Sequence, residues 1–180
     1  MKKSVVLVLV ALICISAVFA ADNSVKVSAV PYALQISTTS EKGVDSVNSR
    51  YGFGLEAAYQ RKLTGGLFAE AGVAWHTFLM PDSKPAFTNI LAFAGVGYKF
   101  EFAKKFACSV SADVGTDTLI YNSKVSENIT LLAGFDASYA INDSIEILLG
   151  CRSSFGFAKK DSTKFVNYRI IPVLGVNFEF

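Results

Sequence analysis

Residues 166–180 read VNYRIIPVLGVNFEF, and this stretch decides the fold class. One set of alternate positions is apolar: Val166, Tyr168, Ile170, Pro172, Leu174, Val176, Phe178 and Phe180. The other set carries polar and small residues: Asn167, Arg169, Gly175, Asn177 and Glu179. Because successive side chains of a strand point to opposite faces, this period of two predicts a long β-strand with one apolar face.

The same period recurs through the rest of the chain. Residues 128–139 alternate clearly, with Phe135 and Tyr139 on the apolar side and Gly134 and Asp136 on the other. We expect eight strands, at 25–38, 50–60, 66–76, 87–100, 106–120, 128–139, 145–157 and 166–180. Strands of about 11 to 15 residues are long compared with the roughly five or six residues usual in globular sheets.

The connections between these strands are of two kinds. Short ones are expected at 61–65, 101–105 and 141–144, and longer polar ones at 39–49, 80–86, 122–127 and 158–164. Short turns at one end and longer loops at the other are typical of transmembrane barrels with an even number of antiparallel strands. The sequence therefore predicts an all-β fold, an eight-stranded antiparallel up-and-down transmembrane β-barrel.

The first twenty residues have the pattern of an export signal. Lys2 and Lys3 precede an apolar run, and Ala20 supplies the small residue at a cleavage site. We predict a cleaved signal peptide at 1–20 and one outer-membrane barrel domain at 21–180. Loss of the two lysines lowers the number of Lys and Arg from 17 to 15, which equals the 15 Asp and Glu. A chain without net charge offers nucleic acid no basic surface.

Two alternatives exist for this N-terminal segment. A transmembrane anchor is disfavoured because the apolar run is shorter than the roughly 20 residues that a spanning helix needs. Lipoprotein processing at Cys14 is disfavoured because Ile13 is bulky where a small residue is expected. The other two cysteines, Cys108 and Cys151, lie on strands that a third strand separates, so we expect no disulfide.

Alternation alone does not say which face of the barrel is outside, since a soluble barrel would carry its apolar set inside. The polar set, however, is mostly Gly, Ser, Asn and Thr with isolated charges, whereas soluble surfaces carry about 25–35% charged residues. Aromatic residues of the apolar set gather near the strand ends, as at the two interfaces of a membrane. The predicted girdle contains Tyr51, Tyr59, Trp75, Tyr98, Phe100, Phe106, Tyr139 and Tyr168. The apolar face is therefore expected to contact lipid.

The export signal, the eight alternating strands and the closing residues 175–180 resemble the small eight-stranded outer-membrane barrels, which include the OmpA transmembrane domain, OmpX and OmpW. The resemblance does not select a subfamily. It implies the outer membrane of a diderm bacterium, with Gly175, Phe178 and Phe180 as the C-terminal insertion signal that the barrel-assembly machinery reads. Val173 departs from the polar residue common at the start of that signal.

Charged residues on the inward set are expected to form a polar network in the lumen: Glu56, Glu70, Lys99, Asp113, Asp136, Glu146, Arg152 and Arg169. An isolated ion in a narrow lumen is costly to desolvate, so these charges must pair. Interleaved signs predict a plug of ion pairs, and a narrow conduit is the alternative.

Three functions are compatible with such a barrel. The first is a structural or surface-interaction protein acting through the extracellular loops, with an extracellular ligand that the sequence does not identify. The second, implied by the likeness to OmpW, is a narrow channel for small apolar solutes, with Leu91 and Phe93 on its wall. Beyond the lipid and the assembly machinery we expect no nucleic-acid partner and a monomer.

The third and least favoured function is a lipid A-modifying enzyme. Its base would be His76, the only histidine, with helpers at Asp45-Ser46, Asp82-Ser83 or Asp161-Ser162. A catalytic triad requires its members within hydrogen-bond reach, and Asp-Ser is also ordinary turn composition. We therefore predict no catalytic residues, no cofactor and no metal site.

Two prolines fall in the strands that close the barrel. Pro31 lies in the first strand and Pro172 in the last, and each removes one ladder donor. They are either tolerated at a bulge or they weaken the seam and ease closure of the barrel.

Overall fold

The computed structural model describes residues 23–41, 44–79, 85–121, 124–160 and 163–180. The predicted signal peptide at 1–20 lies outside these residues. The strands are β1 (Asn23–Glu41), β2 (Val44–Thr64), β3 (Leu67–Leu79), β4 (Pro85–Ala103), β5 (Phe106–Tyr121), β6 (Lys124–Asn142), β7 (Ile145–Lys160) and β8 (Thr163–Glu179). Across this described part, no helix is long and apolar enough to cross a membrane.

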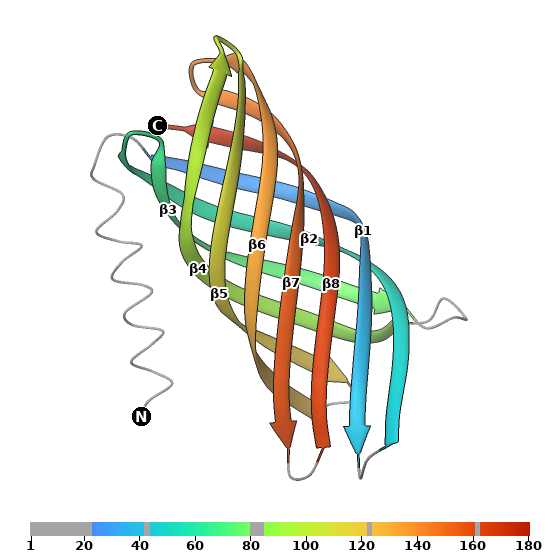
Figure 1. The fold of residues 1–180 in the computed structure, drawn as a ribbon. Helices are drawn as coiled ribbons and strands as arrows, with labels where there is room; N and C mark the ends of the chain where they lie inside the picture. Colours follow the sequence, from blue (N-terminus) through green and yellow to red (C-terminus); the bar gives the residue numbers. More distant parts are fainter. Residues whose placement is uncertain (1–22, 42–43, 80–84, 122–123, 161–162) are drawn as a thin grey trace.

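The eight strands form one closed antiparallel barrel (Figure 1). Each strand pairs with the next along the chain, and β1 pairs with β8 to complete the ring. The predicted fold class and strand count are confirmed. The closing ladder includes Val25 opposite Phe178 and Ser28 opposite Gly175, so the stretch that indicated the fold also closes it.

The connections are shorter than predicted, apart from the predicted loop at 80–86, which lies mostly outside the described residues. The three short ones are two-residue turns, at Gly65-Gly66, Lys104-Lys105 and Asp143-Ser144. Gly65 and Gly66 both have positive φ, +55° and +89°, as the tightest hairpin turns require. These turns lie at the upper end of Figure 1, which we call the turn end.

The predicted loops at 39–49, 122–127 and 158–164 were wrong in extent, because most of each is strand. At the opposite end of the barrel, the loop end, pairing continues to Glu41 opposite Val44 and to Lys160 opposite Thr163. Serine, threonine and valine tolerate extended backbone well, so polar composition there did not end the ladder. The loop end therefore carries projecting β-hairpins.

Side chains divide cleanly between the two faces of the wall. Large apolar residues on the outside remain exposed, including Leu55, Val73, Leu131, Leu149 and Leu174. Inside lie charged residues and two apolar clusters, one around Phe78, Leu148 and Ile171 and one around Leu91, Phe93 and Leu132. A barrel that exposes its aliphatic residues and buries its ions has the polarity of a membrane protein.

Small residues on the inner wall make room for large ones opposite. A Cβ added at Gly72 would strike the ring of Phe93 and the Cβ of Ala58. A Cβ at Gly97 would likewise strike the ring of Phe68. The inward glycines thus let aromatic rings lie flat against the wall of a narrow barrel.

Both prolines lie where the closing seam is interrupted. Pro31 and Tyr32 together face one residue of β2, which makes a β-bulge. Between the pairs Ala29–Leu174 and Leu34–Ile170, four residues of β1 face three of β8, among them Pro172. The bulge explains how the barrel accommodates Pro31. The interruption of the β1–β8 ladder is also compatible with the second alternative, a weakened seam.

Amide exchange is expected to be faster at this seam than elsewhere in the wall. The amides of Val30, Tyr32, Ala33, Ile171 and Val173 that point across the seam should exchange roughly fivefold faster, since one missing hydrogen bond is worth about 1 kcal/mol. The comparison is the β5–β6 ladder, which runs without a register shift from Phe106 to Tyr121. Hydrogen exchange followed by NMR in detergent measures both. Equal protection of the two ladders would contradict the weakened seam.

Candidate functional site in the barrel interior

The structure places the eight predicted lumen residues on the inner face of the wall. Six of them are buried: Glu56, Glu70, Asp113, Asp136, Arg152 and Arg169. Lys99 and Glu146, nearer the turn end, are half-buried. They do not form one network but three groups, at the middle, the loop side and the turn end of the lumen.

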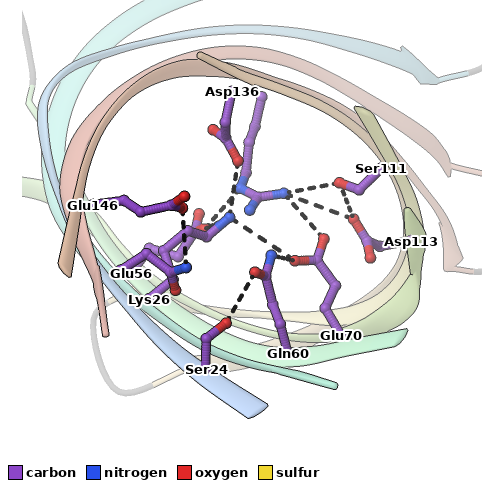
Figure 2. A network of polar contacts seen from close by, with 11 residues as sticks. Ser24, Lys26, Glu56, Gln60, Glu70, Ser111, Asp113, Asp136 and Glu146 are labelled. Carbon is purple, nitrogen blue, oxygen red and sulfur yellow. Dashed lines mark hydrogen bonds and ion pairs between the residues drawn. The ribbon is translucent and has the colours of Figure 1, made fainter. Parts of the chain in front are cut away.

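Arg152 on β7 is the centre of the middle group. Its Nε donates to Glu56 Oε1 at 2.7 Å, and its Nη1 donates to Ser111 Oγ at 3.3 Å. The same Nη1 lies 3.6 Å from Glu70 Oε1 and 3.7 Å from Asp113 Oδ2. Figure 2 shows these acids converging from several strands into the lumen. One guanidinium thus holds together carboxylates from β2, β3 and β5.

Lys26 on β1 completes the middle group and was not predicted. Its Nζ donates to Asp136 Oδ2 at 3.1 Å and lies 3.9 Å from oxygens of both Glu56 and Glu70. The signal was present in the sequence, since Lys26 alternates with the apolar Val25 and Val27. With Lys26 included, two cations face four carboxylates. None of these six side chains is more than 11% exposed.

Arg169 on β8 holds the group on the loop side. It is ion-paired with Asp117 through Nη2, and its Nε donates to Gln35 Oε1 at 2.9 Å. Asp117 was also missed, although it shares the inward parity of Asp113 and Gly115. The ion pair of Arg169 with Asp117 therefore forms a group of its own, separate from the middle group.

Apolar and aromatic side chains fill the lumen between and beyond these ions. Leu91 and Phe93 are buried, and the Arg152 guanidinium lies over the Phe93 ring at 5.4 Å. Toward the loop end, Phe78 and Phe87 stack at 5.1 Å. Arg169 lies over Phe78 and Arg50 lies over Phe87 at 5.2 Å. Alternating ionic and aromatic layers cross the lumen.

The third group lies at the turn end and is more accessible. Lys99 Nζ donates to Glu146 Oε1 at 2.7 Å and to Glu179 Oε1 at 3.1 Å. Lys62 Nζ lies 3.5 Å from the other oxygen of Glu179. These side chains line a hollow of about 360 Å³, whose inner part reaches Lys26 and Asp136.

The predicted girdle residues lie on the outer wall. All of them are exposed except Tyr59, which is half-buried and whose hydroxyl donates to Asn23 Oδ1 at 2.5 Å. Toward the turn end, Tyr98 and Phe100 lie 4.6 Å apart, and Phe106 and Tyr139 lie 4.9 Å apart. Of the predicted insertion signal, Phe178 and Phe180 face outward and Gly175 lies inside.

The surroundings of His76 do not resemble a catalytic centre. The ring is fully buried, and its Nδ1 is in hydrogen-bond contact with Asn89 Oδ1 at 3.1 Å. The suggested helpers at 82–83 and 161–162 lie outside the described residues, and the side chains of Asp45-Ser46 are likewise not described. Both Cys108 and Cys151 are free thiols. Within the described ranges, no group of three His, Cys, Asp or Glu side chains could hold a metal ion.

Comparison of the structure with solved structures identifies the class of fold. Neisserial surface protein A aligns with a TM-score of 0.62 at 16% identity, covering 88% of this chain and 97% of that protein. The outer membrane protein OprG from Pseudomonas aeruginosa gives 0.56 at 10% identity, with coverage of 89% and 97%. The outer membrane protease OmpT from Escherichia coli gives 0.54 at 6% identity, with coverage of 88% and 97%.

The chain therefore has the fold of the small outer-membrane β-barrels, as the sequence resemblance implied. No protein-family model matches the chain, and no curated protein matches it by sequence. At these low identities the likeness defines the fold alone, so the function is argued from the interior.

Proposed function

We propose that this protein is an integral outer-membrane β-barrel with a sealed lumen, which acts as a structural or surface-interaction protein through its loop-end hairpins. In this proposal it resides in the outer membrane of a diderm bacterium, inserted by the barrel-assembly machinery as a monomer. Its exposed aliphatic wall contacts lipid, and its turn end faces the periplasm, as in barrels with short periplasmic turns.

The observation that carries the proposal is the ionic layer around Arg152. Carboxylates from four strands meet Arg152 and Lys26 with side-chain exposures of 11% or less. A water-filled pore would hydrate these ions, whereas here they are packed against one another, and buried oxygens of Glu70, Asp113 and Asp136 have no hydrogen-bond partner among the described residues. The adjacent Leu91 and Phe93, which an apolar channel would need on a free wall, are packed inside the layer.

The purified barrel is expected to form no steady channels in planar lipid bilayers, because buried ions and apolar clusters occupy the described part of the lumen. The matched control is the double variant Arg152→Ala with Phe93→Ala. It removes two large side chains that stack across the lumen, and it should leak ions. Steady, high-conductance channels from the unmodified protein would defeat the sealed lumen and favour a conduit.

The hairpin tips are expected to carry any surface interaction. Replacing 40–45 and 159–164 by two-residue Asn-Gly turns shortens both hairpins while their ladders below the tips remain. An expressing bacterial strain should then lose the adherence to surfaces or to other cells that this proposal expects the unmodified barrel to confer. The control replaces Lys104-Lys105 at the turn end by Asn-Gly. If adherence is unchanged by the loop-end replacement, or is never conferred, the surface role fails.

A non-enzymatic role agrees with the position of His76. Its ring nitrogen contacts an amide of Asn89 in the buried interior, away from the outer wall where lipid would approach. His76→Ala is therefore expected to leave the lipid A profile of the host unchanged. An altered profile would revive the enzymatic alternative.

A further inference from the structure

The hollow at the turn end differs from the rest of the lumen, because its charges are reachable from outside. Its volume of about 360 Å³ lies at the lower end of the range of small-molecule sites. A second hollow of about 240 Å³ shares Lys99, Glu101, Glu146 and Glu179 with it. The ion pairs that Lys99 makes with Glu146 and Glu179 therefore border both hollows.

The charges around the first hollow are interleaved and nearly balanced. Three lysines and four carboxylates line it. Lys62 and Lys99 both contact Glu179, and Lys99 also contacts Glu146. A ligand of one sign would gain one attraction and meet one repulsion, so this lining gives neither a simple anion nor a simple cation an advantage.

A molecule with charges of both signs fits this lining better. Its ammonium can replace a lysine on Glu179 or Glu146, and its carboxylate can then pair with the lysine released. The Lys62–Glu179 pair, whose lysine is half exposed, is of the weak kind that exchanges most readily, while the Lys99 pairs are only partly open to water. On another side of the hollow, the Ser138 hydroxyl of β6 supplies a neutral hydrogen-bonding group for a peptide unit.

We infer that the turn-end hollow binds small zwitterions, with an amino acid or a dipeptide as the ligand class. The ammonium is held by Glu146 and Glu179, and the carboxylate by Lys62 and Lys99. The inner limit of the hollow is the layer of Lys26 and Asp136, so the ligand enters and leaves by the turn end. This goes beyond the sealed barrel proposed above, since binding needs only the open mouth.

The test is an NMR titration of the refolded barrel in detergent micelles with three matched probes. Glycylglycine carries both charges, N-acetylglycylglycine only the carboxylate, and glycylglycine amide only the ammonium. Glycylglycine should give saturable shifts of the amides of Gly66, Ser138 and Asn177. Each singly charged probe should bind more weakly, by up to about fivefold, because it loses one ion pair.

Two variants and one control locate the site. Lys62→Gln and Glu179→Gln should each weaken glycylglycine binding by about fivefold. Arg61→Gln removes a neighbouring cation that lines neither hollow, and it should leave the binding unchanged. Thermal unfolding of each variant verifies that the barrel is intact.

Three results would overturn the inference: no saturable shift with glycylglycine, equal binding of a singly charged probe, or equal effects of Lys62→Gln and Arg61→Gln. None of them bears on the bilayer conductance, so the sealed lumen is judged separately.

Discussion

Arg152→Ala is expected to lower the free energy of unfolding by about 3–5 kcal/mol, the usual cost of removing one partner from a buried ion pair. The substitution leaves Glu56, Glu70 and Asp113 in the closed interior with Lys26 as the remaining cation of the middle group. Urea unfolding of the refolded barrel in lipid vesicles, extrapolated linearly to water, gives the free energy.

Two further variants separate this effect from a general loss of packing. Adding Glu56→Gln to Arg152→Ala should recover part of the lost stability, because it removes a carboxylate that has lost its closest partner. Arg61→Ala, which removes an exposed arginine, should change stability by no more than about 0.5 kcal/mol. If Arg152→Ala and Arg61→Ala lower the free energy of unfolding by similarly small amounts, the interior ions are hydrated and the lumen is not sealed.

The fold was predictable because the membrane imposes a strict pattern on a barrel wall. Lipid on one side and a narrow lumen on the other favour regular alternation of side chains along a strand, as in 128–139 and 166–180. The ends of the strands were less predictable. Beyond the lipid, the alternation of apolar and polar residues is no longer required. Backbone pairing nevertheless continues to Glu41 and Lys160.

The interior could be predicted as a set of residues but not as a set of pairs. Alternation along the strands placed Glu56, Glu70 and Arg152 inside. The same alternation also places Lys26 and Asp117 on the inward face. Which ion meets which depends on strand register and stagger around the barrel. The Lys26–Asp136 pair, for example, joins residues 110 positions apart, and its strands are not neighbours.

The first strand illustrates how one local irregularity obscures a pattern. At the bulge, Pro31 and Tyr32 both face outward, so the inward parity passes from Val30 to Ala33. A strict period of two fails across that point. The shift keeps Val30 and Ala33 together in the apolar cluster with Ile171 and Val173. The bulge thus allows both halves of β1 to line the lumen.

In our proposal, the layered lumen lets a sealed barrel keep an accessible site at its turn end. The middle group is closed by its own ions, whereas at the turn end Lys62 is half exposed and Glu179 about a quarter exposed. The same residue types therefore serve two purposes at different depths. Buried pairs fix the structure, and exposed pairs can exchange with a ligand.

Phe180→Ser is expected to prevent most of the protein from assembling into the outer membrane in cells. The same substitution should reduce refolding of the purified barrel in detergent much less. The Phe180 ring is 62% exposed on the outer wall, so its loss should cost less than the roughly 1.5–3 kcal/mol of a fully buried phenylalanine. The backbone pairing of Phe180 with Asn23 does not need the ring. A large defect in cells would therefore come from recognition during insertion, as the resemblance to small outer-membrane barrels implies.

The control for this prediction is Phe100→Ser. Phe100 is 51% exposed on the same outer wall toward the turn end, but it lies outside the predicted insertion signal at 175–180. Heat-modifiable mobility on gels, applied to membrane fractions and to protein refolded in detergent, reports assembly in both settings. If only Phe180→Ser fails in cells while both variants refold, the closing strand is an insertion signal as well as part of the wall. If both variants assemble equally in cells, the aromatic pair of β8 has no role beyond contact with lipid.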